Sequence, residues 1–162
     1  MTSDKPTVRD LVMRQQSGGL FYVTPAVSVQ EAARSMQSHG VSAICVMAEG
    51  GGGFRLAGIL SEKDISHLVA RGGDPARTRV QDIMTVDVHT VDIDTPLWET
   101  ATFMLHHNVR HLPVLQDGQP FSTISMRDVL GLVVERLAAE VDSLRAHIDW
   151  IGFMSGQSSG PG

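Results

Sequence analysis

A serine followed three residues later by an aspartate occurs twice in this chain, each time in similar surroundings. The segment Ser61–Asp64 follows the apolar run 56–60, and Ser125–Asp128 follows residues 121–124. Each pattern predicts a strand that ends in a hydroxyl group and leads directly into a helix with a carboxylate in its first turn. Such a serine can cap the helix, and the carboxylate suits the positive end of the helix dipole. One copy alone would be an ordinary capping box. The duplication points to a role beyond capping.

The two motifs lie inside a longer internal repeat. Residues 8–11 recur as residues 80–83, and residues 44–46 align with 112–114. Further positions recur at one constant spacing: Glu31, Ala33, Met36 and Val41 match Glu99, Ala101, Met104 and Val109. Two copies, rather than an array, predict one pseudo-symmetric module in which each copy covers the apolar face of the other.

Each copy is expected to contain a β-α-β-β-α succession. In the first copy the sequence predicts strands over 20–23, 41–47 and 54–60, and helices over 28–40 and 62–70. In the second copy it predicts strands over 86–91, 110–116 and 120–124, and a helix over 95–107. A further helix opens at Ser125.

Composition excludes several classes of function. The chain has 162 residues, of which 42% are hydrophobic, which suits one domain or two closely packed halves. A net charge of −5 without a Lys/Arg stripe argues against nucleic-acid binding. No segment approaches the roughly 18 to 20 apolar residues of a membrane span, and no signal peptide precedes residue 20. We therefore expect a cytoplasmic protein without a membrane partner.

Catalytic and metal sites are not expected. The single cysteine, Cys45, lies in an apolar run and is expected to be a small buried side chain of a strand. It excludes an intrachain disulfide framework and lacks the neighbours of a zinc site. The sequence shows no pairing of a nucleophile with a base, and adjacent histidines at a helix end, such as His106 and His107, point apart.

The order of elements and the repeated motifs resemble a tandem pair of CBS domains (cystathionine beta-synthase domains), together called a Bateman module. The resemblance is carried by residues 58–65 and 125–129, by 109–114 and 82–85, and by the helix entries at Ser28 and Pro96. It covers about residues 8–136. It implies an α/β (α+β) fold in which two β-α-β-β-α repeats, over 8–72 and 80–136, pack with pseudo-twofold symmetry.

The resemblance implies a regulatory binding module rather than an enzyme. Modules of this family commonly bind adenosine-containing nucleotides in two clefts between their halves, and occupancy of the clefts regulates a partner. Asp64 or Asp128 would accept hydrogen bonds from two ribose hydroxyls, while Ser61 or Ser125 would meet a phosphate beside the helix-start amides. The leading ligand is AMP-like, with NAD(H), ATP and S-adenosylmethionine as alternatives, and no other cofactor is required.

Carried over position by position, the resemblance assigns residues to both clefts. The cleft around Asp128 would be lined by Phe21, Val41, Ser42, Arg110, His111, Thr123 and Ser125. The mirror cleft around Asp64 would be lined by Ile59, Ser61, Thr85, Val88, Val109 and Arg110. Only the second copy supplies an Arg-His pair, which favours the Asp128 cleft for phosphate. The second copy also has Ser122 where the family has glycine, so the shape of its base pocket stays open.

Beyond the second copy, apolar residues recur with heptad spacing. We call these residues the seam: Leu130, Val134, Leu137, Val141, Leu144, Ile148 and Ile151. They predict a helical extension over 137–154 that pairs with another helix, most simply in a homodimer. Two alternatives stay open, a helix that lies on its own domain and a ligand-free interaction module that docks an unidentified partner enzyme. Residues 155–162 are rich in Gly, Ser and Pro and are expected to form a disordered tail.

Overall fold

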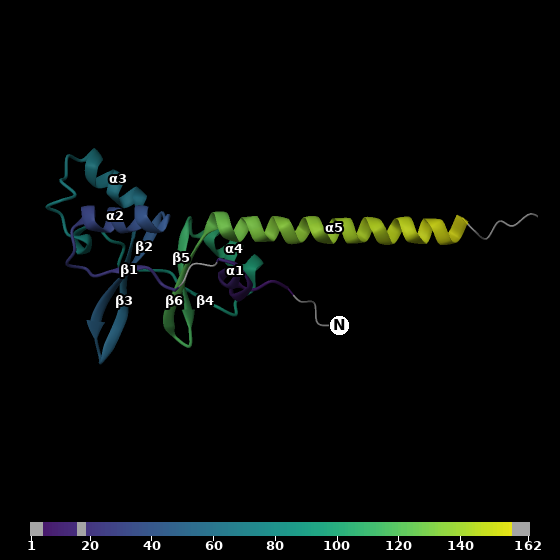
Figure 1. Cartoon of the computed structure of the whole chain (residues 1–162), viewed down its shortest axis with the longest axis horizontal. Coiled ribbons are helices and arrows are strands. Elements are labelled where there is room, and N and C mark those ends of the chain that lie inside the picture. Colours follow the sequence, from purple (N-terminus) through teal and green to yellow (C-terminus); the bar gives the residue numbers. More distant parts are fainter. Residues whose placement is uncertain (1–4, 16–18, 157–162) are drawn as a thin grey trace, which may run out of the picture.

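The computed structural model describes residues 5–15 and 19–156. Two similar halves lie side by side, and one long helix extends away from them (Figure 1). The first half contains α1 (Val8–Arg14), β1 (Tyr22–Val23), α2 (Val29–His39), β2 (Ala43–Gly50), β3 (Gly53–Ser61) and α3 (Glu62–Ala70). The second contains a 3₁₀ turn (Val80–Asp82), β4 (Val91–Asp92), α4 (Leu97–His106), β5 (His111–Gln116), β6 (Gln119–Ser125) and α5 (Met126–Gly156).

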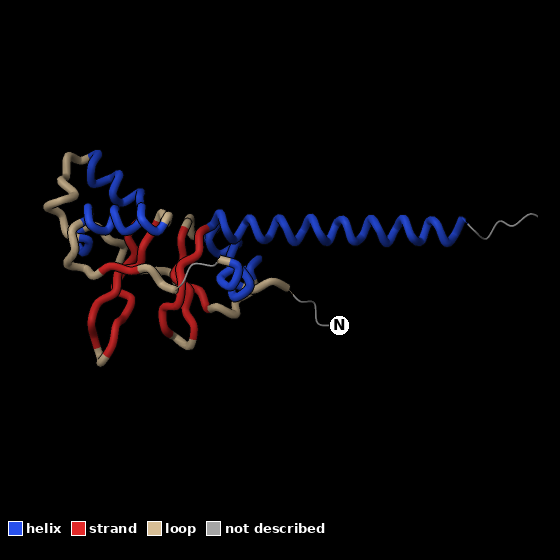
Figure 2. The backbone as a smooth tube through the Cα atoms, viewed as in Figure 1, coloured by secondary structure: helices blue, strands red, loops and turns tan. Residues whose placement is uncertain are grey.

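Each half is built on a three-stranded sheet, and the two sheets have the same topology (Figure 2). In the order β1-β2-β3 the first pair is parallel and the second antiparallel, and β4-β5-β6 repeats this arrangement. Even the irregularity in register recurs, between Val46 and Met47 in one sheet and between Val114 and Leu115 in the other. The predicted mixed α/β fold with a duplicated β-α-β-β-α order is confirmed.

The segment that precedes each half packs against the other half. The Val8 amide donates to the carbonyl of Thr95 at 2.9 Å, and the Val80 amide donates to the carbonyl of Val27 at 3.0 Å. Val8 and Leu11 are buried in the core of the second half, whereas Val80 is buried in the core of the first. The boundaries expected from the repeat, 8–72 and 80–136, follow the symmetry of the sequence. The first residues of each repeat, however, are buried in the core of the other half. This exchange ties the two halves together.

The strand predicted over 86–91 is wrong except for its last residue. Residues 86 and 87 form a bend, residues 88–90 have no regular secondary structure, and β4 contains only Val91 and Asp92. The reason is tertiary, because the backbone of Thr85 pairs with Ile59 of β3 through two hydrogen bonds of 3.0 Å. The chain must then cross the space between the halves before it reaches its own sheet.

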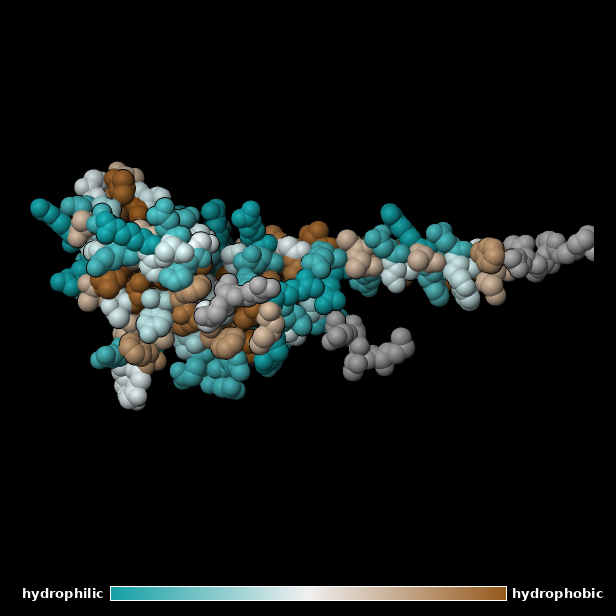
Figure 3. Space-filling view, in the orientation of Figure 1, coloured by the Kyte–Doolittle hydropathy of each residue, from teal (hydrophilic) through white to brown (hydrophobic). Residues whose placement is uncertain are grey.

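Helix α5 is continuous from Met126 to Gly156 and projects far beyond the two halves (Figure 1). Val129 and Leu132 are buried at its base, where Arg14 forms an ion pair of 2.9 Å with Glu135. Every described side chain from 134 to 154 is exposed. The alternative of a helix that lies on its own domain is therefore wrong. Figure 3 shows apolar side chains among polar ones along this projecting part.

The predicted extension over 137–154 belongs to this same helix. The expected disordered tail is wrong at its first two residues, which close the last turn of α5, and residues 157–162 lie outside the described residues. Within the ranges described, no helix is long and apolar enough to cross a membrane.

Candidate functional site

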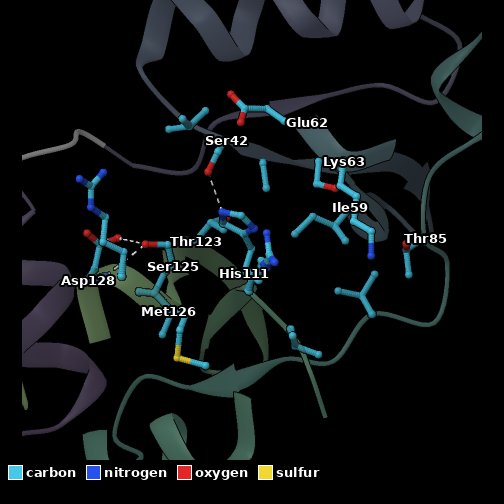
Figure 4. A pocket seen from close by; sticks show the side chains of 18 of the residues that line it. Ser42, Ile59, Glu62, Lys63, Thr85, His111, Thr123, Ser125, Met126 and Asp128 are labelled. Atoms are coloured by element: carbon cyan, nitrogen blue, oxygen red, sulfur yellow. Dashed lines mark hydrogen bonds between the residues drawn. The ribbon is translucent and has the colours of Figure 1, made fainter. Parts of the chain in front are cut away.

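A cleft of about 1160 Å³ separates the two halves. Every residue predicted for either ligand site lines this one cleft, so the two expected clefts are continuous with each other. The ends of β3 and β6 and the starts of α3 and α5 bring both Ser-x-x-Asp motifs to it. Figure 4 shows side chains from both halves pointing into the shared space. The role of these residues in binding stays a prediction.

Equivalent backbone hydrogen bonds fix the two helix starts. The Glu62 amide donates to the carbonyl of Ser42 at 3.0 Å, and the Met126 amide donates to the carbonyl of Arg110 at 2.8 Å. In each half, this bond holds the first turn of the helix beside the start of the middle strand. The next amides of each first turn have no carbonyl partner within the helix itself. Both helix starts therefore present polar backbone groups at the cleft.

The serine and aspartate of each motif are hydrogen-bonded to each other. Ser61 donates to Asp64 Oδ2 through its hydroxyl at 2.6 Å and through its amide at 2.8 Å. The Ser125 hydroxyl donates to Asp128 Oδ2, and the Asp128 amide donates to the Ser125 hydroxyl at 3.2 Å. Among the described residues, no group hydrogen-bonds Oδ1 of either aspartate. The pairs are thus helix caps whose carboxylates keep acceptor capacity for another molecule.

A histidine links the two halves across the cleft. His111 Nε2 lies 2.7 Å from the Ser42 hydroxyl oxygen, and the two side chains point toward each other (Figure 4). Burial lowers the pKa of His111, while the carboxylates of Glu62 and Asp128 act in the opposite direction. Because burial dominates, the neutral form of His111 is favoured. It can then exchange one hydrogen bond with Ser42 and keep its other ring nitrogen for a second partner.

A second polar contact between the halves involves the single cysteine. Cys45 Sγ lies 3.3 Å from Thr123 Oγ1. Burial raises the pKa of the Cys45 thiol, which is fully covered in strand β2. The thiol therefore stays protonated, as expected for a small buried side chain of a strand.

Gly58 allows the connection between the halves to approach β3 closely. A Cβ atom at this position would lie 2.7 Å from Met84 Sδ and 2.8 Å from the carbonyl oxygen of Thr85. The segment that packs against the second half in the place equivalent to 80–85 is helix α1. This helix continues to Arg14 instead of turning to pair with β6. Ser122 therefore fits where the first half requires glycine, which explains the departure from the family pattern.

Sequence reasoning missed two acidic residues of the cleft. Glu62 follows Ser61 directly and lies in the first turn of α3, so its place beside the motif was a usable signal. Asp87 reaches the cleft only because residues 86–90 do not form the predicted strand. Carboxylates at both positions join Asp64 and Asp128, while the cationic side chains of the lining are Lys63, Arg110 and Arg127. Within the described ranges, no three possible metal ligands are grouped together.

The sequence-family model of the CBS domain matches residues 8–71 and 80–135, so the chain belongs to the CBS-domain family. The CBS domain-containing protein CBSX3, mitochondrial, of Arabidopsis thaliana is 29% identical over 151 residues, which cover 90% of this chain and 73% of that protein. The crystal structure of the CBS-domain containing protein ATU1752 from Agrobacterium tumefaciens has a TM-score of 0.69 at 26% identity. It covers 78% of this chain and 98% of that one.

Two structural neighbours were solved with adenosine compounds. The CBS domain protein PAE2072 from Pyrobaculum aerophilum, complexed with AMP, has a TM-score of 0.66 at 22% identity and covers 76% of this chain and 89% of its own. The CBS domain pair of MJ0100, in complex with 5′-methylthioadenosine and S-adenosyl-L-methionine, has a TM-score of 0.68 at 23% identity. It covers 82% of this chain and 98% of its own. At these identities the likeness to this chain concerns the fold.

Proposed function

We propose that this chain is a regulatory module that senses an adenine nucleotide in the cleft between its two CBS domains. The observation that carries the proposal is the meeting of two Ser–Asp helix starts, Ser61–Asp64 and Ser125–Asp128, in one cleft. The ligands of the two structural neighbours, AMP and the two sulfur-containing adenosines, share the adenosine group. AMP is our leading ligand, and NAD(H), ATP and S-adenosylmethionine are the alternatives.

The arrangement suits a nucleotide in three ways. Asp128 Oδ1 accepts from ribose hydroxyls, since the Ser125 hydroxyl occupies only the other oxygen. The Arg110 guanidinium and the helix-start amides supply positive charge to a phosphate. Ile59 and Thr123, which line the cleft from β3 and β6, contribute the less polar surface for the base.

Ligand occupancy regulates by holding the two halves together. A nucleotide in this cleft contacts residues of both halves, so it binds better to one relative placement of the halves than to others. The second motif lies at the start of α5, so a change at Ser125 also changes the direction of the projecting helix. The module acts without catalysis, on a partner enzyme that this helix or the CBS helices contact. We place it in the cytoplasm, although the Arabidopsis relative is named as mitochondrial.

Isothermal titration calorimetry tests the proposal with the full chain. AMP, ATP, NAD⁺, S-adenosylmethionine and adenosine form the panel, and GMP is the control for the base. A ligand present at 100 times its Kd should raise the unfolding free energy by about 2.7 kcal/mol, which thermal denaturation detects independently. Absence of both binding heat and stabilisation with every adenine compound would contradict the proposal.

A ligand-free interaction module is the second candidate, and the exposed seam of α5 favours it. Residues such as Leu137, at 56% exposure, and Ile148, at 67%, have no partner among the described residues. In this case no nucleotide would stabilise the protein, while the seam would still bind another helix. The nucleotide panel therefore separates the two candidates.

A further inference from the structure

We propose that the seam of α5 pairs with the seam of a second copy to form a parallel, in-register, two-stranded coiled coil. Self-association through α5 follows from the spacing of the seam alone. The direction and alignment of the two helices follow from features of α5 that are independent of any nucleotide.

The apolar side chains of the projecting part of α5 are exposed in the part of the chain that the structure describes. The buried residues of the helix lie at the base, with Val129 at 0% and Leu132 at 4% exposure, and described side chains from 134 to 154 are all exposed. Leu132 lies on the side of the helix opposite the seam, so the seam faces away from its own domain. Valine, isoleucine and glycine are weak helix formers, and most of the stability of a helix in a protein comes from the packing of its apolar face. Packing against another chain is what stabilises it.

The residue types of the seam select a parallel pair. In a heptad labelled a to g, the seam alternates between positions a and d. The a positions hold Val134, Val141 and Ile148, and the d positions hold Leu130, Leu137, Leu144 and Ile151. Branching at Cβ in position a, combined with leucine in position d, favours two parallel strands. The seam has this arrangement in two successive heptads, Val134 with Leu137 and Val141 with Leu144, and only the last d position, Ile151, departs from it.

The charges beside the seam agree with this direction and fix the alignment. Glu140 occupies position g, and Arg145 occupies position e of the following heptad. In a parallel, in-register pair, each Glu140 faces Arg145 of the second copy, which gives two complementary pairs per dimer. In an antiparallel pair g faces g and e faces e, so neither contact forms.

The polar side of α5 argues against a lipid surface as the occupant of the seam. Between 137 and 154 the helix carries Glu140, Asp142 and Asp149 but only Arg145 as a permanent cation. Helices that lie on membranes are rich in Lys and Arg on their polar face, because they bind anionic lipids. The net negative charge disfavours that contact, whereas a second copy matches both the apolar seam and the flanking charges.

Sedimentation equilibrium of the full chain tests the surface. Leu144→Asp should raise the dimer dissociation constant at least roughly 100-fold, because both copies lose a buried leucine. Ser143→Asp, a matched change on the next residue outside the seam, should change it less than about twofold. The same Leu144→Asp protein should still bind AMP, because Leu144 lies outside the cleft. A loss of dimerisation and a loss of nucleotide binding can therefore be told apart.

Disulfide formation tests the direction. Ile151→Cys should cross-link almost completely on mild oxidation, because in-register copies place both sulfur atoms at the same level. In an antiparallel pair centred on the seam these atoms would lie roughly 30 Å apart. Ser143→Cys should not cross-link, and the unmodified chain is a control for the buried Cys45.

The charges give an independent test of alignment. Arg145→Glu should weaken the dimer roughly tenfold, and the exchange Glu140→Arg with Arg145→Glu should restore it. A monomeric native chain at about 100 µM or a dimer indifferent to Leu144→Asp would overturn the proposal. Cross-linking that occurs only between Leu130→Cys and Ile151→Cys chains would indicate an antiparallel pair and would also overturn the proposal.

Discussion

The two halves share a backbone plan but differ in the side chains that they present to the cleft. Glu62 and Met126 make the same amide hydrogen bond at their helix starts, yet one is a carboxylate and the other is apolar. At the start of the middle strand the first half has Ser42-Ala43, where the second has Arg110-His111. Each helix start also carries one cation and one aspartate, Lys63 with Asp64 and Arg127 with Asp128, so the halves differ by an additional carboxylate at the first and an additional cation beside the second.

The pseudo-symmetry of the fold therefore does not make the two ends of the cleft chemically equivalent. A phosphate is repelled near Glu62 and attracted near Arg110, so the end of the cleft at Asp128 suits the phosphate of AMP better. The fold requires the backbone bonds in both halves, whereas the side chains at the helix starts are free to diverge. We expect two binding events of unequal affinity.

The largest effect is expected where one half has glycine and the other has serine. Gly58→Ala should lower the unfolding free energy by about 2 to 3 kcal/mol, because its Cβ would meet the backbone carbonyl of Thr85, which cannot rotate away. Ser122→Ala, the matched change in the second half, should cost less than about 1 kcal/mol. Urea denaturation of both variants measures the difference. Equal losses would show that the close approach at Gly58 is not a constraint.

Replacing one aspartate at a time should separate the two binding events. Asp128→Asn should weaken the tighter AMP site by about 1.5 to 3 kcal/mol, since hydrogen bonds to a charged group are lost while the shape is kept. Asp64→Asn should weaken the other site by a similar amount and leave the tighter one in place. Calorimetric titration with AMP resolves both events. Unchanged binding in both single variants and in the double variant would contradict the ribose assignment.

Local signals in the sequence predicted most of the fold. The capping residues and apolar spacing predicted α3 over Glu62–Ala70 as observed. The strands predicted over 110–116 and 120–124 are observed as β5 and β6, and Asp117 and Gly118 in the turn between them adopt the positive φ angles, of 51° and 74°, that this residue pair favours. These features depend on neighbouring residues only. Which residues line the cleft was implied by the resemblance to CBS domains, carried over position by position, and not by the local signals.

The features that the sequence did not reveal depend on contacts between distant segments. Val86 and Val88 alternate with polar residues as in a strand, but pairing of Thr85 with Ile59 directs this segment across the cleft. The sequence also did not reveal that Val8 packs in the core of the second half and Val80 in the core of the first, because a valine suits either core. Asp87 was missed as a cleft residue for the same reason.

A smaller and more selective effect is expected at Arg110. Arg110→Ala should weaken AMP binding by about 1 to 1.5 kcal/mol and leave adenosine nearly unchanged, because only AMP carries the phosphate. Lys63→Ala removes a cation from the other helix start and should affect the tighter AMP site less. Competition titrations with both ligands measure the selectivity. Equal losses for AMP and adenosine would mean that Arg110 supports the fold rather than the phosphate.

The smallest effect concerns His111, which has only Ala43 as its counterpart in the first half. Burial lowers the pKa of His111 below its ordinary value of 6.5, against the opposing influence of Glu62 and Asp128. As the pH falls through about 6.5, His111 binds a proton in the unfolded chain while it remains unprotonated in the folded chain. The unfolding free energy should therefore decrease, until the pH passes below the pKa of the folded state.

His111→Asn should flatten this pH dependence. Urea denaturation of the native chain and of this variant at a series of pH values between about 5 and 8 measures the slopes, which are interpreted through the difference in bound protons. Equal slopes for the native chain and His111→Asn would mean that the imidazole is solvated like any surface histidine. The hydrogen bond between His111 and Ser42 would then contribute little to holding the halves together, and the inequality of the two ends of the cleft would rest on Glu62 and Arg110 alone.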